Sequence, residues 1–125
     1  MTSDGETDYP AAKKRVAYFY DADFGSFWYG DSHPMKPQRV RMTHELIASY
    51  GLYEHMDTYA PTQANARSMT KFHGSAYVDF LQVANQAVVK ENRMSAAYFG
   101  IGDSQNDCPV FDGMFEMNKI LTGTP

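Results

Sequence analysis

Residues 16–20 read VAYFY, an uninterrupted run of aliphatic and aromatic side chains that ends at Asp21. Because no polar residue interrupts it, the run predicts a strand buried on both faces, as in a parallel sheet. One turn of buried helix is the alternative, but a short run rich in branched and aromatic residues favours the strand. A second stretch, MDTYA at 56–60, is closed by Pro61 and predicts another short strand.

A helix is predicted between these two strands. Pro37 suits the first helical position, where a missing N–H costs nothing. The residues QRVRMTHELIASY follow, with an apolar face at Val40, His44 and Ile47. Gly51 is the expected stop, because glycine readily adopts the left-handed conformation at a helix end. A strand, a helix and a second strand in this order are typical of an α/β domain.

Three further helices are predicted after the second strand. Thr62 and Ser75 can each act as an N-cap, because their hydroxyl oxygens accept a backbone N–H bond. Gly123 is expected to end the last helix. The three predicted helices span about 62–72, 75–88 and 111–121, with mostly loop over 90–110.

The domain organisation follows from length and element count. A chain of 125 residues is enough for one small domain. Residues 1–14 are predicted to form a flexible N-terminal arm. Two parallel strands leave open edges that stable domains pair or cover. We therefore expect residues 15–125 to be the N-terminal part of a larger α/β domain whose sheet continues beyond Pro125.

Composition narrows the class of protein. Apolar residues make up 43% and charged residues 21%, which is ordinary for a globular protein. The net charge of −4 argues against direct binding of nucleic acid, which favours a basic surface. The single cysteine, Cys108, excludes an intrachain disulfide and fits a reducing compartment. No apolar run approaches the length of a membrane span.

The side chains that could carry chemistry are few. Asp31 and His33 have Asp-x-His spacing, but zinc needs a third ligand and an oriented histidine, so a loop-folding role for His33 is favoured. His44 is interpreted as a buried, hydrogen-bonded histidine of the apolar helix face. Cys108 follows Asp107, and an adjacent carboxylate disfavours the thiolate that a nucleophile needs.

The most unusual segment is HPMKPQR at 33–39, which follows the aromatic loop FWYG at 27–30. Two prolines fix the path of the chain. Lys36 and Arg39 then place two cations in the loop and the first helical turn. A cation near a helix N-terminus is unfavourable unless an anion or carbonyl groups compensate it. A solvated basic surface is the alternative.

With these segments the sequence resembles class I zinc-dependent histone deacetylases. The resemblance runs through VAYFYDADFGSFWYGDSHPMKPQRVRMTHELIASYGLY, ANARSMTKFHGSAYVDFLQ, NDCPVFDGMFE and LTG, and covers residues 15–123. The HPMKP and DCPVFDG segments are its most specific parts. It implies an arginase/deacetylase-type α/β domain around an eight-stranded parallel sheet, of which this chain would be the N-terminal third. It also implies hydrolysis of acetyl-lysine amides by a zinc-bound water.

The resemblance places the reacting groups outside these residues. The paired histidines of the family, its Asp-x-His motif, its second aspartate ligand and its tyrosine have no counterpart here. No catalytic residue and no zinc ligand is therefore expected, although zinc is the cofactor of the family. This chain by itself is expected to be inactive.

The resemblance assigns supporting roles to several residues. Asp107 matches the rim aspartate that holds the backbone of the acetyl-lysine peptide, a task that suits a carboxylate because it accepts two N–H bonds. Three extra residues in this loop make Asp103 a competitor for that role. Tyr29, Met35 and Arg39 match residues of the internal cavity thought to serve acetate release.

Two positions of the loop and one of the last helix depart from the family pattern. Lys36 matches a lysine that binds inositol phosphate in some members, but Trp28 and Ser32 replace the histidine and glycine that accompany it there. Met117 stands where the family usually has a cavity-lining phenylalanine.

The implied partners are acetylated histone tails and corepressor proteins, with no direct nucleic-acid or membrane contact. The implied location is the nucleus, with the cytoplasm as an additional one. A non-catalytic interaction module that binds a corepressor or a partner deacetylase is the rival hypothesis. A relative that acts on small amines, or an arginase-like enzyme, ranks last, because HPMKP and DCPVFDG fit the histone enzymes better.

Overall fold

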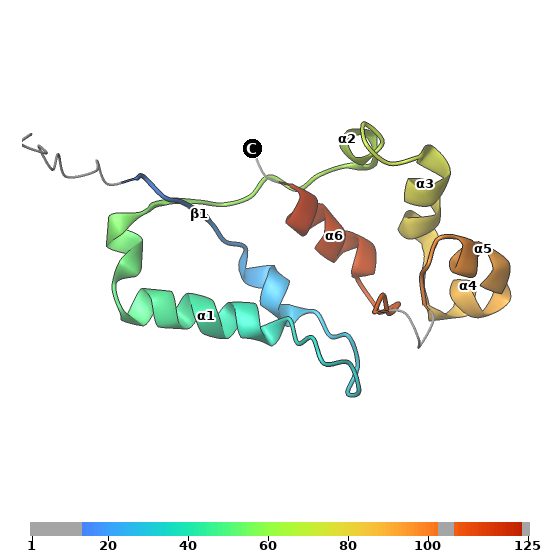
Figure 1. The fold of residues 1–125 in the computed structure, drawn as a ribbon, viewed down its shortest axis with the longest axis horizontal. Helices are drawn as coiled ribbons and strands as arrows, with labels where there is room; N and C mark the ends of the chain where they lie inside the picture. Colours follow the sequence, from blue (N-terminus) through green and yellow to red (C-terminus); the bar gives the residue numbers. More distant parts are fainter. Residues whose placement is uncertain (1–13, 103–106, 124–125) are drawn as a thin grey trace, which may run out of the picture.

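The computed structural model describes residues 14–102 and 107–123. Its chain begins with a strand, a helix and a second strand (Figure 1). Strands β1 (Ala17–Phe19) and β2 (Asp57–Tyr59) pair in parallel, with Tyr18 opposite Thr58. The predicted order of two parallel strands around one helix is therefore confirmed.

Helix α1 (Gln38–Ser49) has the boundaries that the sequence predicts to within one residue. Pro37 forms the N-cap and Gly51 adopts a positive φ of 67° just after the helix. The helix packs between two short 3-10 helices, η1 (Ala22–Ser26) and η2 (Leu52–His55). Pro37 is fully buried, so the proline that starts α1 also anchors it.

The expectation that β1 is buried on both faces is wrong. Its three residues are exposed or half-buried, because β2 and α1 are the elements that lie against it among the described residues. His44 is likewise only half-buried, but the expected hydrogen bond is present: the Tyr18 hydroxyl lies 3.0 Å from His44 Nδ1. The His44 ring also stacks on Tyr20, with centroids 3.4 Å apart.

The second half contains more helices than predicted, and they are shorter. Thr62 does not cap a helix; Asn65 does, in a reciprocal capping box with Ser68. Gly74 rather than Ser75 is the next N-cap. The observed helices are α2 (Ala66–Met69), α3 (Ser75–Val83), α4 (Gln86–Glu91), α5 (Arg93–Tyr98) and α6 (Met114–Thr122).

Three expectations in this half fail for local reasons. The helix predicted over 75–88 breaks at Ala84, which is extended with ψ 116°, and Asn85 then caps α4 by accepting the Val88 N–H. Residues 90–110, expected to be mostly loop, contain α5 and the end of α4. The last helix starts later than expected, because Gly113, with φ 79°, is its N-cap.

Most of the buried side chains lie in this second half. One cluster of buried residues joins Phe24 of η1 to α3, α6 and the segments before α6, and a smaller one lies beneath α2 and α3. In Figure 1, α6 runs between the β1–α1 part and α3. Among the described residues, no helix has the length and apolar character needed to cross a membrane.

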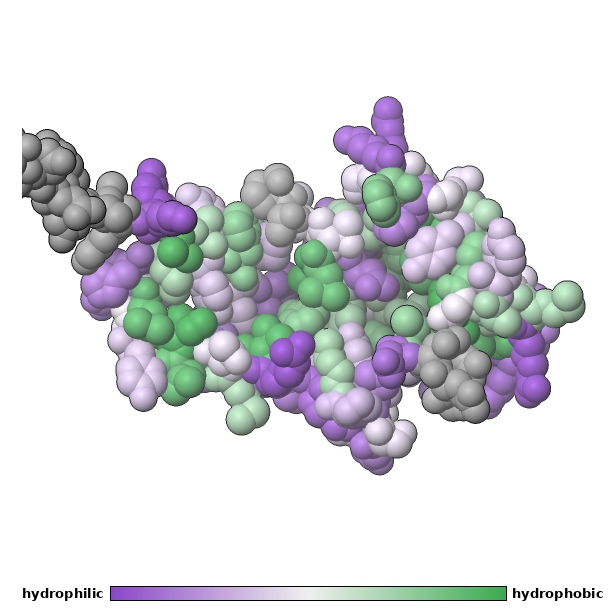
Figure 2. All heavy atoms as spheres, in the orientation of Figure 1, coloured by the Kyte–Doolittle hydropathy of each residue, from purple (hydrophilic) through white to green (hydrophobic). Residues whose placement is uncertain are grey.

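Hydrophobic side chains remain exposed on the first half. Figure 2 shows them gathered over the end of α1 and η2. Leu46, Tyr50 and Tyr53 are 57%, 73% and 50% exposed, respectively. These residues therefore gain little from burial within the part of the chain that the structure describes.

Candidate functional site

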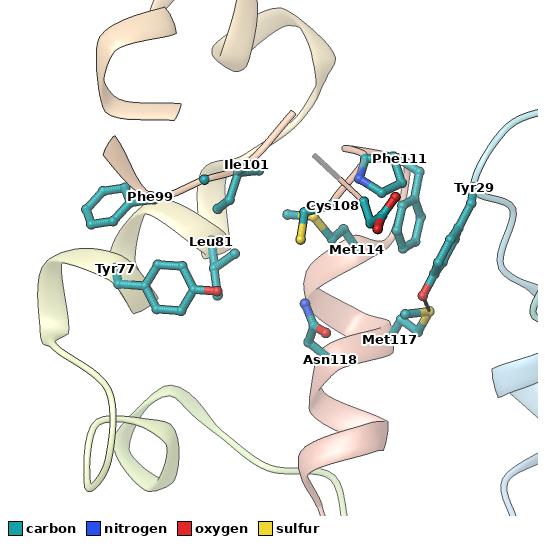
Figure 3. Close-up of a pocket in the computed structure, with 13 residues that line it drawn as sticks. Tyr29, Tyr77, Leu81, Phe99, Ile101, Cys108, Phe111, Met114, Met117 and Asn118 are labelled. Atoms are coloured by element: carbon teal, nitrogen blue, oxygen red, sulfur yellow. Dashed lines mark hydrogen bonds between the residues drawn. The ribbon is translucent and has the colours of Figure 1, made fainter. Parts of the chain in front are cut away.

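A cavity of about 230 Å³ lies between α3, α6, the aromatic loop and the segment before α6 (Figure 3). It is lined by residues from four separate stretches of sequence. Tyr29 comes from the aromatic loop, Tyr77 and Leu81 from α3, and Met114 and Met117 from α6. Asp107, Cys108 and Pro109 form part of its rim.

Tyr29 reaches across from the aromatic loop to α6. Its hydroxyl donates to the Met117 sulfur at 3.6 Å, and its ring stacks on Phe111 with centroids 4.6 Å apart. Burial raises the pKa of the Tyr29 hydroxyl above its ordinary value; Arg39 opposes the shift and Cys108 adds to it. A Tyr29 that stays neutral can donate a hydrogen bond but carries no charge into the cavity.

The side of the cavity formed by α3 and α6 combines apolar side chains with the Tyr77 hydroxyl and the Asn118 amide. Tyr77 and Leu81 lie one helical turn apart on α3, so they share a face. Figure 3 shows them facing Met114 and Asn118 of α6. Tyr77 and Leu81 were not singled out from the sequence, so their position in the cavity was not predicted.

Three of the residues singled out from the sequence meet here. Tyr29, Asp107 and Met117 line the same cavity, although 88 positions separate Tyr29 from Met117. Asp107 is exposed at the rim, where its carboxylate is open to a ligand. Asp103, the competing aspartate, lies outside the described residues.

The other two predicted cavity residues are not in its lining. Arg39 is exposed on the first turn of α1, yet close enough for its charge to act on Tyr29. The Met35 N–H donates to His33 Nδ1 at 3.1 Å, which gives His33 the loop-folding role expected of it. Neither Met35 nor Arg39 therefore contributes to the lining of this cavity.

Lys36 is held within its own loop. Its ammonium donates to the Gly30 and Asp31 carbonyl oxygens, each at 2.9 Å. It also lies 4.8 Å from the centre of the Trp28 ring. The chain itself thus supplies the carbonyl groups that hold the Lys36 ammonium.

The described residues do not fit a zinc site. Across 14–102 and 107–123, no three His, Cys, Asp or Glu side chains come together in a group that could hold a metal ion. Asp31 and His33 have no third ligand beside them, and the His33 Nδ1 atom is occupied by a backbone N–H. No step of a metal-dependent reaction is therefore assigned to these residues.

A parallel β–α–β start followed by a helical layer, with a cavity near the aromatic loop, defines part of an α/β domain. The profile of the family described as "Histone deacetylase domain" matches residues 33–124. The chain therefore belongs to the histone deacetylase family, as the motifs at 33–39 and 107–113 indicated.

Curated relatives agree with this assignment. Histone deacetylase 1 of Bos taurus is 46% identical over 111 residues, which cover 89% of this chain and 22% of that protein. Histone deacetylase HDAC1 of Drosophila melanogaster is 46% identical over 90% of this chain and 21% of its own length. Histone deacetylase RPD3 of Saccharomyces cerevisiae is 46% identical over 91% of this chain and 26% of its own length. The chain thus spans about a fifth to a quarter of the relatives it matches.

Proposed function

We propose that this chain supplies part of the substrate site of a protein-lysine deacetylase acting on acetylated histone tails in the nucleus. In this proposal Asp107 holds the peptide backbone at the rim, and Tyr29 and Met117 form the inner wall. Arg39 and Met35 do not line the cavity and support the loop that carries Tyr29. Residues outside this chain supply the ligands of the family's zinc ion and its reacting groups.

The cavity shared by Tyr29, Asp107 and Met117 carries the proposal. A substrate site needs an apolar wall for an alkyl chain and a polar group at its entrance. The cavity offers both: tyrosine, leucine and methionine inside, and the Asp107 carboxylate at the edge. A carboxylate can accept two peptide N–H bonds, which fixes the backbone of an extended peptide.

Peptide binding tests the role of Asp107. We expect a dye-labelled acetyl-lysine peptide to bind the 125-residue chain, measured by fluorescence anisotropy. Asp107→Asn should weaken binding about ten- to hundredfold, because a hydrogen bond to a charged group contributes about 1.5–3 kcal/mol. Asp112→Asn is the matched control, since Asp112 is exposed and does not line the cavity. Equal losses in both variants would count against Asp107.

A deacetylation assay tests whether the reacting groups lie outside this chain. The purified chain with added zinc should release no acetate from the same peptide, because no group of His, Cys, Asp or Glu side chains within 14–102 and 107–123 could hold a metal ion. Zinc-dependent turnover that a chelator abolishes would contradict the proposal that the reacting groups lie elsewhere.

A non-catalytic interaction module is the second candidate, and one observation favours it. Met42, Leu46 and Tyr50 of the first helix and its end are 71%, 57% and 73% exposed. Large apolar side chains left open together favour a protein partner such as a corepressor or a deacetylase. This candidate predicts partner binding that Leu46→Ser weakens and Asp107→Asn leaves unchanged.

A further inference from the structure

The aromatic loop is closed by one lysine. The Lys36 ammonium donates to the carbonyl oxygens of Gly30 and Asp31, both at 2.9 Å. It also lies 4.8 Å from the centre of the Trp28 ring, within range of a cation–π contact. An ammonium has three N–H donors, and the chain satisfies two of them and stabilises the charge through the ring.

These contacts surround Tyr29 in the sequence. Trp28 precedes Tyr29 and Gly30 follows it, so Lys36 binds the residues on both sides. Gly30 has φ 102°, a conformation that favours glycine and turns the chain at this point. The Tyr29 side chain itself reaches Phe111 and Met117.

The other end of the loop is held by contacts of His33 and Pro37. His33 Nδ1 accepts the Met35 N–H at 3.1 Å, and the His33 ring meets the Tyr29 ring edge to face, with centroids 5.2 Å apart. Pro37 is fully buried at the start of α1. Trp28 is 48% exposed, so the Lys36 contacts hold the outer side, where packing is weakest.

We propose that Lys36 is a positioning residue that clamps the 28–36 loop and thereby holds the Tyr29 ring in the cavity. The positive charge is essential to the clamp, since both carbonyl oxygens and the ring face attract a cation. The inference rests on the proposed function only in giving the Tyr29 cavity a substrate. In this role Lys36 touches neither substrate nor metal.

Trp28 provides a direct readout, because it is the only tryptophan of the chain. Lys36→Met keeps the length of the side chain but removes its charge and donors. In the full 125-residue chain we expect this variant to shift Trp28 emission to longer wavelength and to increase its quenching by acrylamide. Lys36→Arg should restore most of the wild-type emission, because it keeps the cation.

The matched control is Lys90→Met on α4, which is exposed and far from the loop in the sequence. It should leave Trp28 emission unchanged. Amide hydrogen exchange measured by mass spectrometry should rise over 28–36 in Lys36→Met and stay constant over α6. Unchanged emission and unchanged exchange in Lys36→Met would overturn the proposal.

A titration with a polyanion provides an independent test of the clamp. Inositol hexakisphosphate added to the wild-type chain should not change Trp28 emission, because the ammonium is already held within the loop. A saturable change would overturn the clamp, because it would mean that the anion draws the Lys36 ammonium away from the loop carbonyl oxygens. This titration uses the wild-type chain, so it decides even if Lys36→Met fails to fold.

The fluorescence and exchange measurements contain no acetylated peptide. Failure of the clamp is therefore distinguishable from failure of the proposed function. If the clamp is present and the function is correct, Lys36→Met should also weaken binding of the acetyl-lysine peptide, and Lys36→Arg should restore it. Restored emission without restored peptide binding would contradict the role of the clamp in the site.

Discussion

The strand–helix–strand part and the helical part of this chain differ in how their apolar residues are covered. No residue of α1 is buried, and β1 and β2 are exposed or half-buried. By contrast, α3 and α6 together bury Val78, Leu81, Met114, Met117 and Ile120. Both parts have amphipathic helices, but the core among the described residues lies mainly in the second part, and Phe24 of η1 is the buried residue that the first part adds to it.

The difference shows that a segment can form a regular helix without burying its side chains in a core. Helix α1 is the longest helix described, with a proline start and a glycine stop, yet its formation owes little to burial. The cavity, in contrast, lies where the core is. Packing therefore holds the residues that form the site. The large apolar side chains of the first part, in contrast, stay exposed within the part of the chain that the structure describes.

The largest expected effect separates two methionines. Met117 is 3% exposed and Met42 is 71% exposed. We expect Met117→Ala to lower the free energy of unfolding by about 2–5 kcal/mol, because it leaves a cavity in the core. Met42→Ala should change it by less than about 0.5 kcal/mol. Urea denaturation followed by circular dichroism measures both, and equal effects would remove the contrast between the two parts.

A second prediction concerns the close approach at the end of α6. A Cβ atom at Gly123 would lie 1.8 Å from the Thr62 carbonyl oxygen, so the backbone must move to admit it. We expect Gly123→Ala to destabilise the chain by about 1–3 kcal/mol. At Gly74, where a Cβ meets nothing within 4 Å, the same change should cost less than about 0.5 kcal/mol. Similar thermal midpoints for the two variants would refute this packing.

A third and smaller effect is expected at the α2 cap. The Asn65 side chain accepts the Ser68 N–H at 2.9 Å, and the Ser68 hydroxyl accepts the Asn65 N–H at 3.0 Å. Asn65→Ala should therefore cost about 1 kcal/mol in chemical denaturation. The neighbouring exposed Gln63→Ala serves as control and should change little. A neutral Asn65→Ala would mean that tertiary packing alone holds α2.

The smallest effect tests the contact between β1 and α1. Tyr18→Phe removes the hydroxyl that meets His44 Nδ1 at 3.0 Å, and should cost about 0.5 kcal/mol at neutral pH, the low end for a partly exposed hydrogen bond. Burial, and secondly Tyr20, raise the pKa of Tyr18 above 10.0. As pH rises past 10, the unfolded chain loses this proton first, so stability falls.

The alkaline loss should therefore be smaller in Tyr18→Phe than in the wild type. Urea midpoints compared between neutral and alkaline pH measure it, and Tyr50→Phe, at a residue 73% exposed, is the control. Parallel alkaline slopes in the wild type and Tyr18→Phe would show that Tyr18 does not couple β1 to α1.

The sequence predicted the first part of the fold well, because its signals are local. A run of β-favouring residues, a proline and a glycine determine β1 and α1 with little help from packing. The second part was predicted less well. There the helices start at the N-caps Asn65, Asn85 and Gly113. Asparagine and glycine are favoured at such positions, but the apolar periodicity of the neighbouring residues suggested other helix starts.

The site was predictable in part. Resemblance marked Tyr29, Asp107 and Met117, which line one cavity. It did not mark Tyr77 or Leu81, because an apolar helix face looks the same whether it lines a core or a cavity. Nor could spacing reveal that Lys36 folds back on carbonyl oxygens five and six residues earlier, since that contact depends on the turn at Gly30.

Hydrogen exchange with and without an acetyl-lysine peptide tests the central claim most directly. The claim is that the packed half of the chain forms the wall of a deacetylase substrate site. We predict that the peptide slows amide exchange in the segments around Tyr29 and over 107–111, and leaves α1 and η2 unchanged. Slowed exchange over α1 and η2, with the cavity segments unaffected, would contradict the claim and favour an interaction module.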